Sequence, residues 1–189
     1  MAAVESQMLP LGTPLPSFEL PDPDGNLHAL PGEAPAYLVM FICNHCPFVR
    51  HVRHELAAIG RDYGRRGVAV VAINSNDAGK YPDDSPARMN EESEAAGYDF
   101  PYLVDEDQAV AKTFRAACTP DFYVFDAQRM LRYRGQLDDS RPGNNKPTDG
   151  HDVRAALDSV LDGQPVAASQ APSIGCNIKW KPGNAPDYA

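Results

Sequence analysis

Basic residues are scarce in this chain relative to acidic ones. Lys and Arg together number 17 against 26 Asp and Glu, which gives a net charge of −9. Nucleic acids and anionic membranes are held mainly through basic surfaces, so neither is an expected partner. Long apolar runs are also missing, and a bilayer-spanning helix needs roughly 20 apolar residues in a row.

Cysteine is rare as well, with four residues in a chain of 189. That is too sparse for a disulfide-rich secreted scaffold. The N-terminal stretch MAAVESQMLPLGTP has neither the basic segment nor the apolar stretch of a secretory signal. We therefore expect a cytoplasmic protein, in which disulfides are usually transient and catalytic.

Two apolar runs frame the predicted fold. The runs AYLVMFI at 36–42 and VAVVAIN at 68–74 have the length of strands that are buried on both faces. Between them, apolar residues recur at three- and four-residue spacing over 47–66, which predicts an amphipathic helix. Strand, helix and strand in this order predict a right-handed parallel crossover.

The rest of the chain alternates between short strands and helices, and a length of 189 residues suits a single domain over 1–189. The further predicted elements are an N-terminal hairpin around 22–25, a helix over 85–97, a strand at 100–105, a helix over 107–117, a hairpin over 119–139 and a helix over 151–166. We expect a core over about 10–163. The C-terminal tail, residues 164–189, carries Ile174, Ile178 and Trp180 and should pack against this core.

Cys43 and Cys46 lie two residues apart, where the first buried strand gives way to the helix. A Cys-x-x-Cys beside a strand-helix-strand pattern is typical of a thioredoxin-like redox site. The free N–H groups at a helix N-terminus favour a thiolate, so we expect a lowered pKa at Cys43, at the exposed mouth of the helix. This predicts that Cys43 attacks and that the more enclosed Cys46 resolves the mixed disulfide.

Histidines near the pair suggest two further roles. His45 can place positive charge or a hydrogen bond beside the Cys43 thiolate, which would make the disulfide more oxidising. A rival hypothesis is a Cys₂His₂ zinc site made of Cys43, Cys46, His51 and His54. On the predicted helix, however, His51 and His54 point away from the pair, so we expect no metal.

The stretch CTPDFYVFD at 118–126 places Thr119-Pro120 before an apolar strand. Together with CNHC at 43–46, it resembles the thioredoxin superfamily over roughly residues 10–163. The resemblance implies an α/β thioredoxin-like fold, with a central mixed sheet, helices on both faces, an N-terminal hairpin and an ordered tail. It also implies that Pro120 is cis and packs against the dithiol, and that the Thr119 backbone edge can pair with a substrate strand.

The stretches LGTPLPSFELPDPDGN and PSIGCNIKWKPGNAPDY are similar to those of peroxiredoxin-like redoxins. This similarity implies a thiol-disulfide oxidoreductase without an organic cofactor, acting on protein or small-molecule disulfides and thiols with an unidentified electron donor. The alternatives are a thiol peroxidase, and a metal-binding or redox-sensing module without turnover. Peroxiredoxins carry Pro-x-x-x-Thr-x-x-Cys around the thiol that reduces peroxide. If Cys46 is that thiol, Val39 stands at the proline position and Cys43 at the threonine position. The hydroxyl that would orient a peroxide is then missing, which weakens the peroxidase alternative.

Two more cysteines are possible redox thiols. Cys118 lies two residues before Pro120 and should come near the dithiol, either as a third redox thiol or as a small core residue. Cys176 lies between Gly175 and Asn177 in the tail, where a turn could return it to the domain as a resolving cysteine or as a packing anchor. Spacing alone does not choose between these alternatives.

Overall fold

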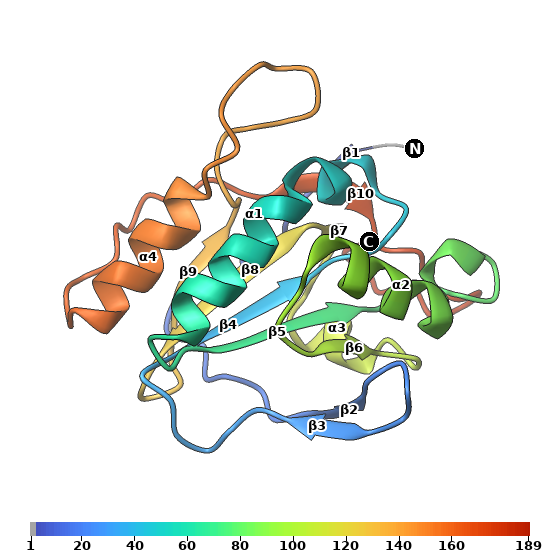
Figure 1. Cartoon of the computed structure of the whole chain (residues 1–189), viewed down its shortest axis with the longest axis horizontal. Helices are drawn as coiled ribbons and strands as arrows, with labels where there is room; N and C mark the ends of the chain where they lie inside the picture. Colours follow the sequence, from blue (N-terminus) through green and yellow to red (C-terminus); the bar gives the residue numbers. More distant parts are fainter. Residues whose placement is uncertain (1–2) are drawn as a thin grey trace.

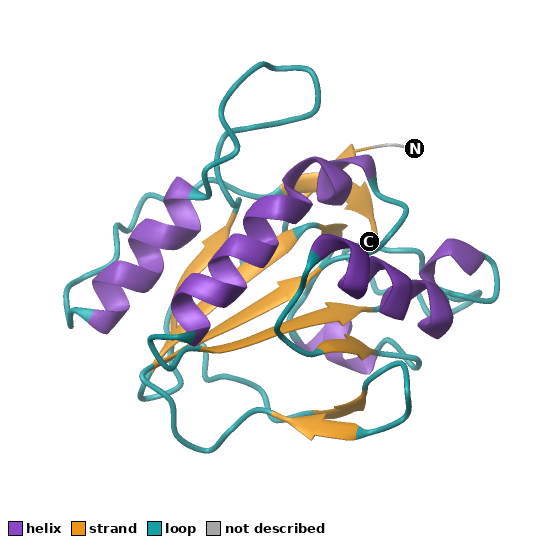
Figure 2. Cartoon of the chain, in the orientation of Figure 1, coloured by secondary structure: helices purple, strands orange, loops and turns teal. Residues whose placement is uncertain are grey.

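The two apolar runs form neighbouring strands at the centre of a five-stranded mixed sheet (Figures 1 and 2). The computed structural model describes residues 3–189. The sheet has the order β6-β5-β4-β8-β9, in which β4, β5 and β6 are parallel while β8 and β9 are antiparallel to their neighbours. Its strands are β4 (Ala36–Phe41), β5 (Ala69–Asn74), β6 (Tyr102–Val104), β8 (Asp121–Asp126) and β9 (Leu131–Gly135).

Helices cover both faces of this sheet, which confirms the predicted fold class (Figure 2). On one face, α1 (Pro47–Gly64), α2 (Pro86–Ala96) and α4 (His151–Leu161) contribute side chains to a core with Leu38 and Met40 of β4. On the other face, α3 (Ala109–Thr113) and the two terminal segments pack against the alternate residues of β4. Alternation along β4 therefore feeds two separate cores, as expected for a strand buried on both sides.

Local chemistry accounts for the bounds of the smaller elements. The strands β2 (Glu19–Pro21) and β3 (Leu27–Ala29) form the predicted N-terminal hairpin. The short 3₁₀ helix η1 (Pro82–Asp84) precedes α2, which begins after Ser85 and ends at Gly97, where a φ of 73° suits glycine. The helix predicted over 107–117 is shorter, because Arg115 adopts a φ of 51° that ends α3.

The tail forms a strand that the sequence pattern does not reveal. The strand β10 (Ile174–Asn177) lies between β1 (Ala3–Glu5) and β7 (Cys118–Thr119) in a second, antiparallel sheet. Ile178 and Trp180 then join the core on the second face of the main sheet, so the tail is ordered as predicted. Residues 1 and 2 of the predicted single domain lie outside the described range.

None of the helices within residues 3–189 is both long enough and apolar enough to cross a membrane.

A carboxyl group is buried where β8 begins. Asp121 is 0% exposed and accepts hydrogen bonds from the Phe122 N–H at 3.1 Å and the Tyr123 hydroxyl at 2.8 Å. Burial outweighs both hydrogen bonds and raises the pKa of Asp121 to about 8. The folded protein therefore holds a proton that an unfolded chain releases near pH ~3.9.

We expect Asp121→Asn to remove a pH dependence of stability. Between pH ~4 and ~8 the folded state binds one proton more than the unfolded state. As the pH rises through this range, the wild-type free energy of unfolding should therefore fall, relative to that of the variant, by up to about 1.4 kcal/mol per pH unit. Urea unfolding of both proteins across this range measures the difference. A difference that stays constant with pH would show that Asp121 is ionised in the folded protein.

Candidate active site

The two cysteines of the Cys-x-x-Cys lie at the junction between β4 and α1. Cys46 is the N-cap residue of α1, with φ −71° and ψ 122°, and Pro47 is the first residue of the helix. Cys43 is 1% exposed and Cys46 is 0% exposed. The predicted exposed position of Cys43 is therefore wrong, because the segment that carries Asp84 and the loop that carries Thr119 both contact the 43–46 turn.

Thr119 contacts both thiols from the neighbouring loop. The Cys43 sulfur lies 3.1 Å from the Thr119 hydroxyl, and the Cys46 thiol lies 3.2 Å from the Thr119 carbonyl oxygen, to which it can donate. The Thr119–Pro120 peptide bond is cis, as the resemblance to thioredoxins implies. One residue thus holds the two sulfurs on the same side of the proline loop.

The Cys46 sulfur lies beside two other thiols. The thiols of Cys176 and Cys43 and the backbone N–H groups of Val49 and Cys176 favour its ionised form, in which it no longer donates to the Thr119 carbonyl oxygen. Although burial opposes ionisation, these donors hold the pKa of Cys46 well below that of an ordinary thiol. Because Val49 is the third residue of α1, part of this effect comes from the free N–H groups of the helix N-terminus.

The pKa of Cys43 shifts in the opposite direction. Its hydrogen bond to Cys46, its burial and the nearby Asp84 carboxylate all raise the pKa of the Cys43 thiol. The prediction of a lowered pKa at Cys43 is therefore wrong. The physical reason is that Cys46, not Cys43, occupies the N-cap position of the helix and receives the donors.

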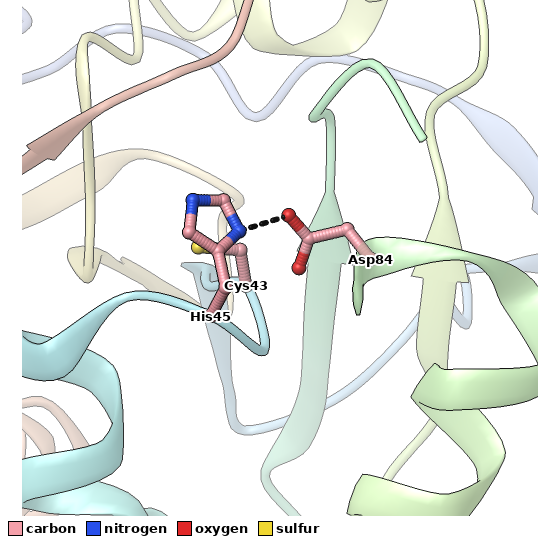
Figure 3. Close-up of side chains that lie close together, drawn as sticks. All are labelled: Cys43, His45 and Asp84. Atoms are coloured by element: carbon pink, nitrogen blue, oxygen red, sulfur yellow. Dashed lines mark hydrogen bonds and ion pairs between the residues drawn. The ribbon is translucent and has the colours of Figure 1, made fainter. Parts of the chain in front are cut away.

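His45 pairs with a carboxylate rather than with a thiol (Figure 3). Its Nδ1 lies 2.5 Å from Oδ2 of Asp84, and its ring stacks on Tyr81 at a centroid distance of 5.4 Å. Asp84 also accepts hydrogen bonds from the Asn44 N–H at 2.7 Å and the Asn76 side chain at 2.8 Å. Burial opposes its ionisation, but these partners keep the pKa of Asp84 below its usual value.

Asp84 changes what His45 can do for Cys43. A protonated His45 would have its charge balanced by Asp84, so the predicted electrostatic support of a Cys43 thiolate is offset by a carboxylate on the same side. Sequence reasoning missed Asp84, which lies 40 residues from Asn44 in a polar insert. Neither spacing nor a motif connects it to the cysteines.

The four residues of the rival zinc hypothesis do not come together. His51 Nε2 lies 2.6 Å from the Ser140 hydroxyl, and His54 is exposed on α1. Ligand atoms of Cys43, His45 and Asp84 lie within 4.8 Å of one another instead (Figure 3). Any metal-binding alternative must therefore rest on this second set, which is a sulfur, nitrogen and oxygen donor set of the kind that Zn²⁺ accepts.

Cys118 is held by carbonyl groups. Its thiol is fully buried and lies 3.7 Å from the Pro120 carbonyl oxygen and 3.9 Å from that of Ser173. Burial, followed by the nearby Asp121, raises the pKa of Cys118 well above the ordinary value. Its surroundings are those of a packed core thiol.

Comparisons with known proteins agree with this fold. A family model described as the AhpC/TSA family matches residues 11–134. A crystal structure of an uncharacterized conserved protein from Geobacillus kaustophilus is 57% identical, with a TM-score of 0.94 over 97% of this chain and 98% of that one. A hypothetical protein from Sinorhizobium meliloti is 52% identical, with a TM-score of 0.93 over 95% and 99%.

A more distant structure shows the same fold. A thioredoxin-family thiol:disulfide interchange protein from Chlorobium tepidum is 19% identical and has a TM-score of 0.61 over 79% of this chain and 97% of that one. No curated protein matches the chain.

We expect Cys46 to be a thiolate in the reduced protein well below pH ~8.5, where an unperturbed thiol titrates. Ultraviolet thiolate absorbance during a pH titration measures it. Cys46→Ala should abolish the acidic transition. Cys43→Ala and Cys176→Ala should each raise the midpoint of the Cys46 transition by about one to two pH units. Each variant removes one donor to the thiolate, and a hydrogen bond to a charged group is worth about 1.5–3 kcal/mol.

Cys118→Ala is the matched control for this titration, because Cys118 faces carbonyl oxygens. It should leave the midpoint unchanged. An acidic transition that survives in Cys46→Ala would assign the thiolate to another cysteine.

Proposed function

This chain belongs to the AhpC/TSA family, and on that premise we propose that it is a thiol-disulfide oxidoreductase whose Cys43 and Cys46 cycle between dithiol and disulfide. The observation that carries the proposal is the double contact of Thr119 with the two sulfurs, at 3.1 and 3.2 Å. This contact keeps a low-pKa thiol and a second thiol together in one buried site. Thiolate character and an adjacent thiol are the two requirements of disulfide exchange.

The pKa difference suggests the order of attack. The Cys46 thiolate attacks a substrate disulfide, forms a mixed disulfide and releases the first substrate thiolate. The Cys43 sulfur then attacks Cys46, its proton passes to the second departing thiolate, and the Cys43–Cys46 disulfide remains. The substrate gains two electrons and the protein loses two. This order reverses the roles expected from the sequence, because the donors converge on Cys46.

A thiol peroxidase is the second candidate. The hydroxyl missing from the Cys43 position of the peroxidase signature has a counterpart in Thr119, whose Oγ1 lies 3.1 Å from the Cys43 sulfur. In that reaction the Cys46 thiolate would attack a hydroperoxide, release an alcohol or water and become a sulfenic acid. A neighbouring thiol would then expel water and form a disulfide.

No organic cofactor is needed for either reaction, because the electrons pass between sulfur atoms or from sulfur to the peroxide oxygen. The cytoplasmic location and the absence of nucleic acid and membrane partners stay predictions. A metal-binding module remains the alternative without turnover, and it would use Cys43, His45 and Asp84.

We expect the reduced protein to turn over a small disulfide, bis(2-hydroxyethyl) disulfide, with dithiothreitol as the reductant. Cys46→Ser should lose this activity by a factor on the order of a thousand, because the nucleophile is gone. Hydrogen peroxide consumption is followed in parallel, and faster turnover of peroxide than of the disulfide would favour the thiol peroxidase. Stoichiometric zinc without turnover of either substrate would favour the metal-binding alternative.

The order of attack is measured by trapping. The double variant Cys43→Ser/Cys176→Ser keeps Cys46 and should accumulate a mixed disulfide with the small substrate, detected by intact mass. The matched variant Cys46→Ser/Cys176→Ser keeps Cys43 and should form it more slowly. Faster formation in the second variant would restore the order expected from the sequence.

A further inference from the structure

The strand edge beside the dithiol is occupied by the chain's own tail (Figure 1). In the antiparallel pairing of β10 with β7, Cys176 lies opposite Thr119 and Asn177 lies opposite Cys118. The Ile178 N–H extends the pairing by donating to the Ala117 carbonyl oxygen at 3.0 Å. An open edge of this kind is where an extended polypeptide adds a strand. Here that position is filled from within the molecule.

The approach of β10 to the proline loop is too close for a side chain. A Cβ on Gly175 would lie 2.0 Å from the Thr119 carbonyl oxygen and 2.6 Å from its carbon. These are backbone atoms, so they cannot move aside as the end of a flexible side chain can. Gly175 is thus the residue that permits the tail to dock against Thr119.

Hydrogen bonds fix the tail on both sides of Gly175. The Ser6 N–H donates to the Ser173 carbonyl oxygen at 2.9 Å. The Lys179 N–H donates to Asn76 at 2.8 Å, and the Lys179 carbonyl oxygen accepts from Asp77 and Gln108. The tail is therefore held in register with the site.

The docked strand brings a thiol to the nucleophile. Cys176 is 3% exposed and lies in the same buried cluster as Cys43 and Cys46. Its thiol and its backbone N–H are both among the neighbouring groups that lower the pKa of Cys46. A disulfide-bearing substrate would have to do the same two things: pair with the Thr119 edge and present a sulfur to the site.

Resting on the proposed function, we propose that β10 is a built-in substrate strand, which closes the Thr119 edge to protein disulfides and presents Cys176 to Cys46 as an internal exchange partner. The docked form then acts on small disulfides. Cys46 forms a mixed disulfide with one half of the small substrate and releases the other half as a thiolate. The Cys176 sulfur attacks Cys46, the second half leaves with the Cys176 proton, and a Cys46–Cys176 disulfide forms. Attack by Cys43 on Cys46 then yields Cys43–Cys46 and returns Cys176 to the thiol.

A carboxylate lies beside one of the two resolving candidates. The Cys43 sulfur and a carboxylate oxygen of Asp84 lie within 4.8 Å of each other, and a nearby negative charge disfavours a thiolate. This favours Cys176 as the first thiol to attack the mixed disulfide.

The first test maps disulfides after one equivalent of bis(2-hydroxyethyl) disulfide. Cys43→Ser should yield a Cys46–Cys176 disulfide, identified by mass spectrometry of peptides from the acid-quenched protein. Cys176→Ser should yield Cys43–Cys46 instead. Cys118→Ser is the matched control and should behave as the wild type. A Cys43→Ser protein that keeps a stable mixed disulfide on Cys46 would overturn the proposal while leaving the proposed function intact.

The second test opens the edge with Gly175→Val. The ratio of the insulin-reduction rate to the small-disulfide-reduction rate should rise roughly tenfold. This is the factor by which the undocked tail becomes more populated when the docked strand loses about one backbone hydrogen bond between β10 and β7. Fluorescence of Trp180, the single tryptophan, should shift to the red as the tail leaves the core. Gly64→Ala is the matched control, because a Cβ at Gly64 meets nothing within 4 Å.

An unchanged ratio in Gly175→Val despite the fluorescence shift would overturn the closure of the edge. If Gly175→Val does not fold, the disulfide map of Cys43→Ser still decides whether Cys176 exchanges with Cys46. A wild-type protein that reacts with neither insulin nor the small disulfide would contradict the proposed function itself.

Discussion

The close contact between the Thr119 backbone and two different segments is the constraint on which this site depends. On one side, its carbonyl oxygen lies 3.2 Å from the Cys46 sulfur and its hydroxyl lies 3.1 Å from that of Cys43. On the other side, β10 approaches so closely that only glycine fits at position 175. Because both contacts involve the same residue, the geometry of the dithiol and the docking of the tail are coupled.

Burial makes the hydrogen-bond donors around the two thiols decisive. Two thiols of similar sequence context acquire opposite pKa shifts. Neighbouring thiols and the helix N-terminus lower the pKa of Cys46, whereas the bond to Cys46, burial and the Asp84 carboxylate raise that of Cys43. A buried thiolate is costly unless several donors surround it. The tail supplies two of these donors from Cys176, so the part of the chain farthest from the motif in sequence helps to define its chemistry.

The hydrogen-bonded pair of His45 and Asp84 forms one polar side of the site, where the carboxylate has three partners. Asp84 accepts hydrogen bonds from Asn44, His45 and Asn76, which ties the insert before α2 to the turn between the cysteines. Such a network restrains the groups that it pairs. Within residues 3–189, His45 Nε2 is buried without a hydrogen-bond partner, which leaves one ring nitrogen available.

The sequence by itself determined the strands of the main sheet, the main helices and the placement of the Cys-x-x-Cys, because these follow from local periodicity and from residues such as Pro47, Pro86 and Gly97 that act within one turn. The cis bond at Pro120 was inferred by resemblance rather than from spacing. Only the tertiary structure decided which cysteine receives the donors, that Asp84 faces Cys43 and that β10 fills the Thr119 edge. These features depend on contacts between segments 40 or more residues apart, such as Asn44 with Asp84 and Cys46 with Thr119, and such contacts have no periodic signature in the chain.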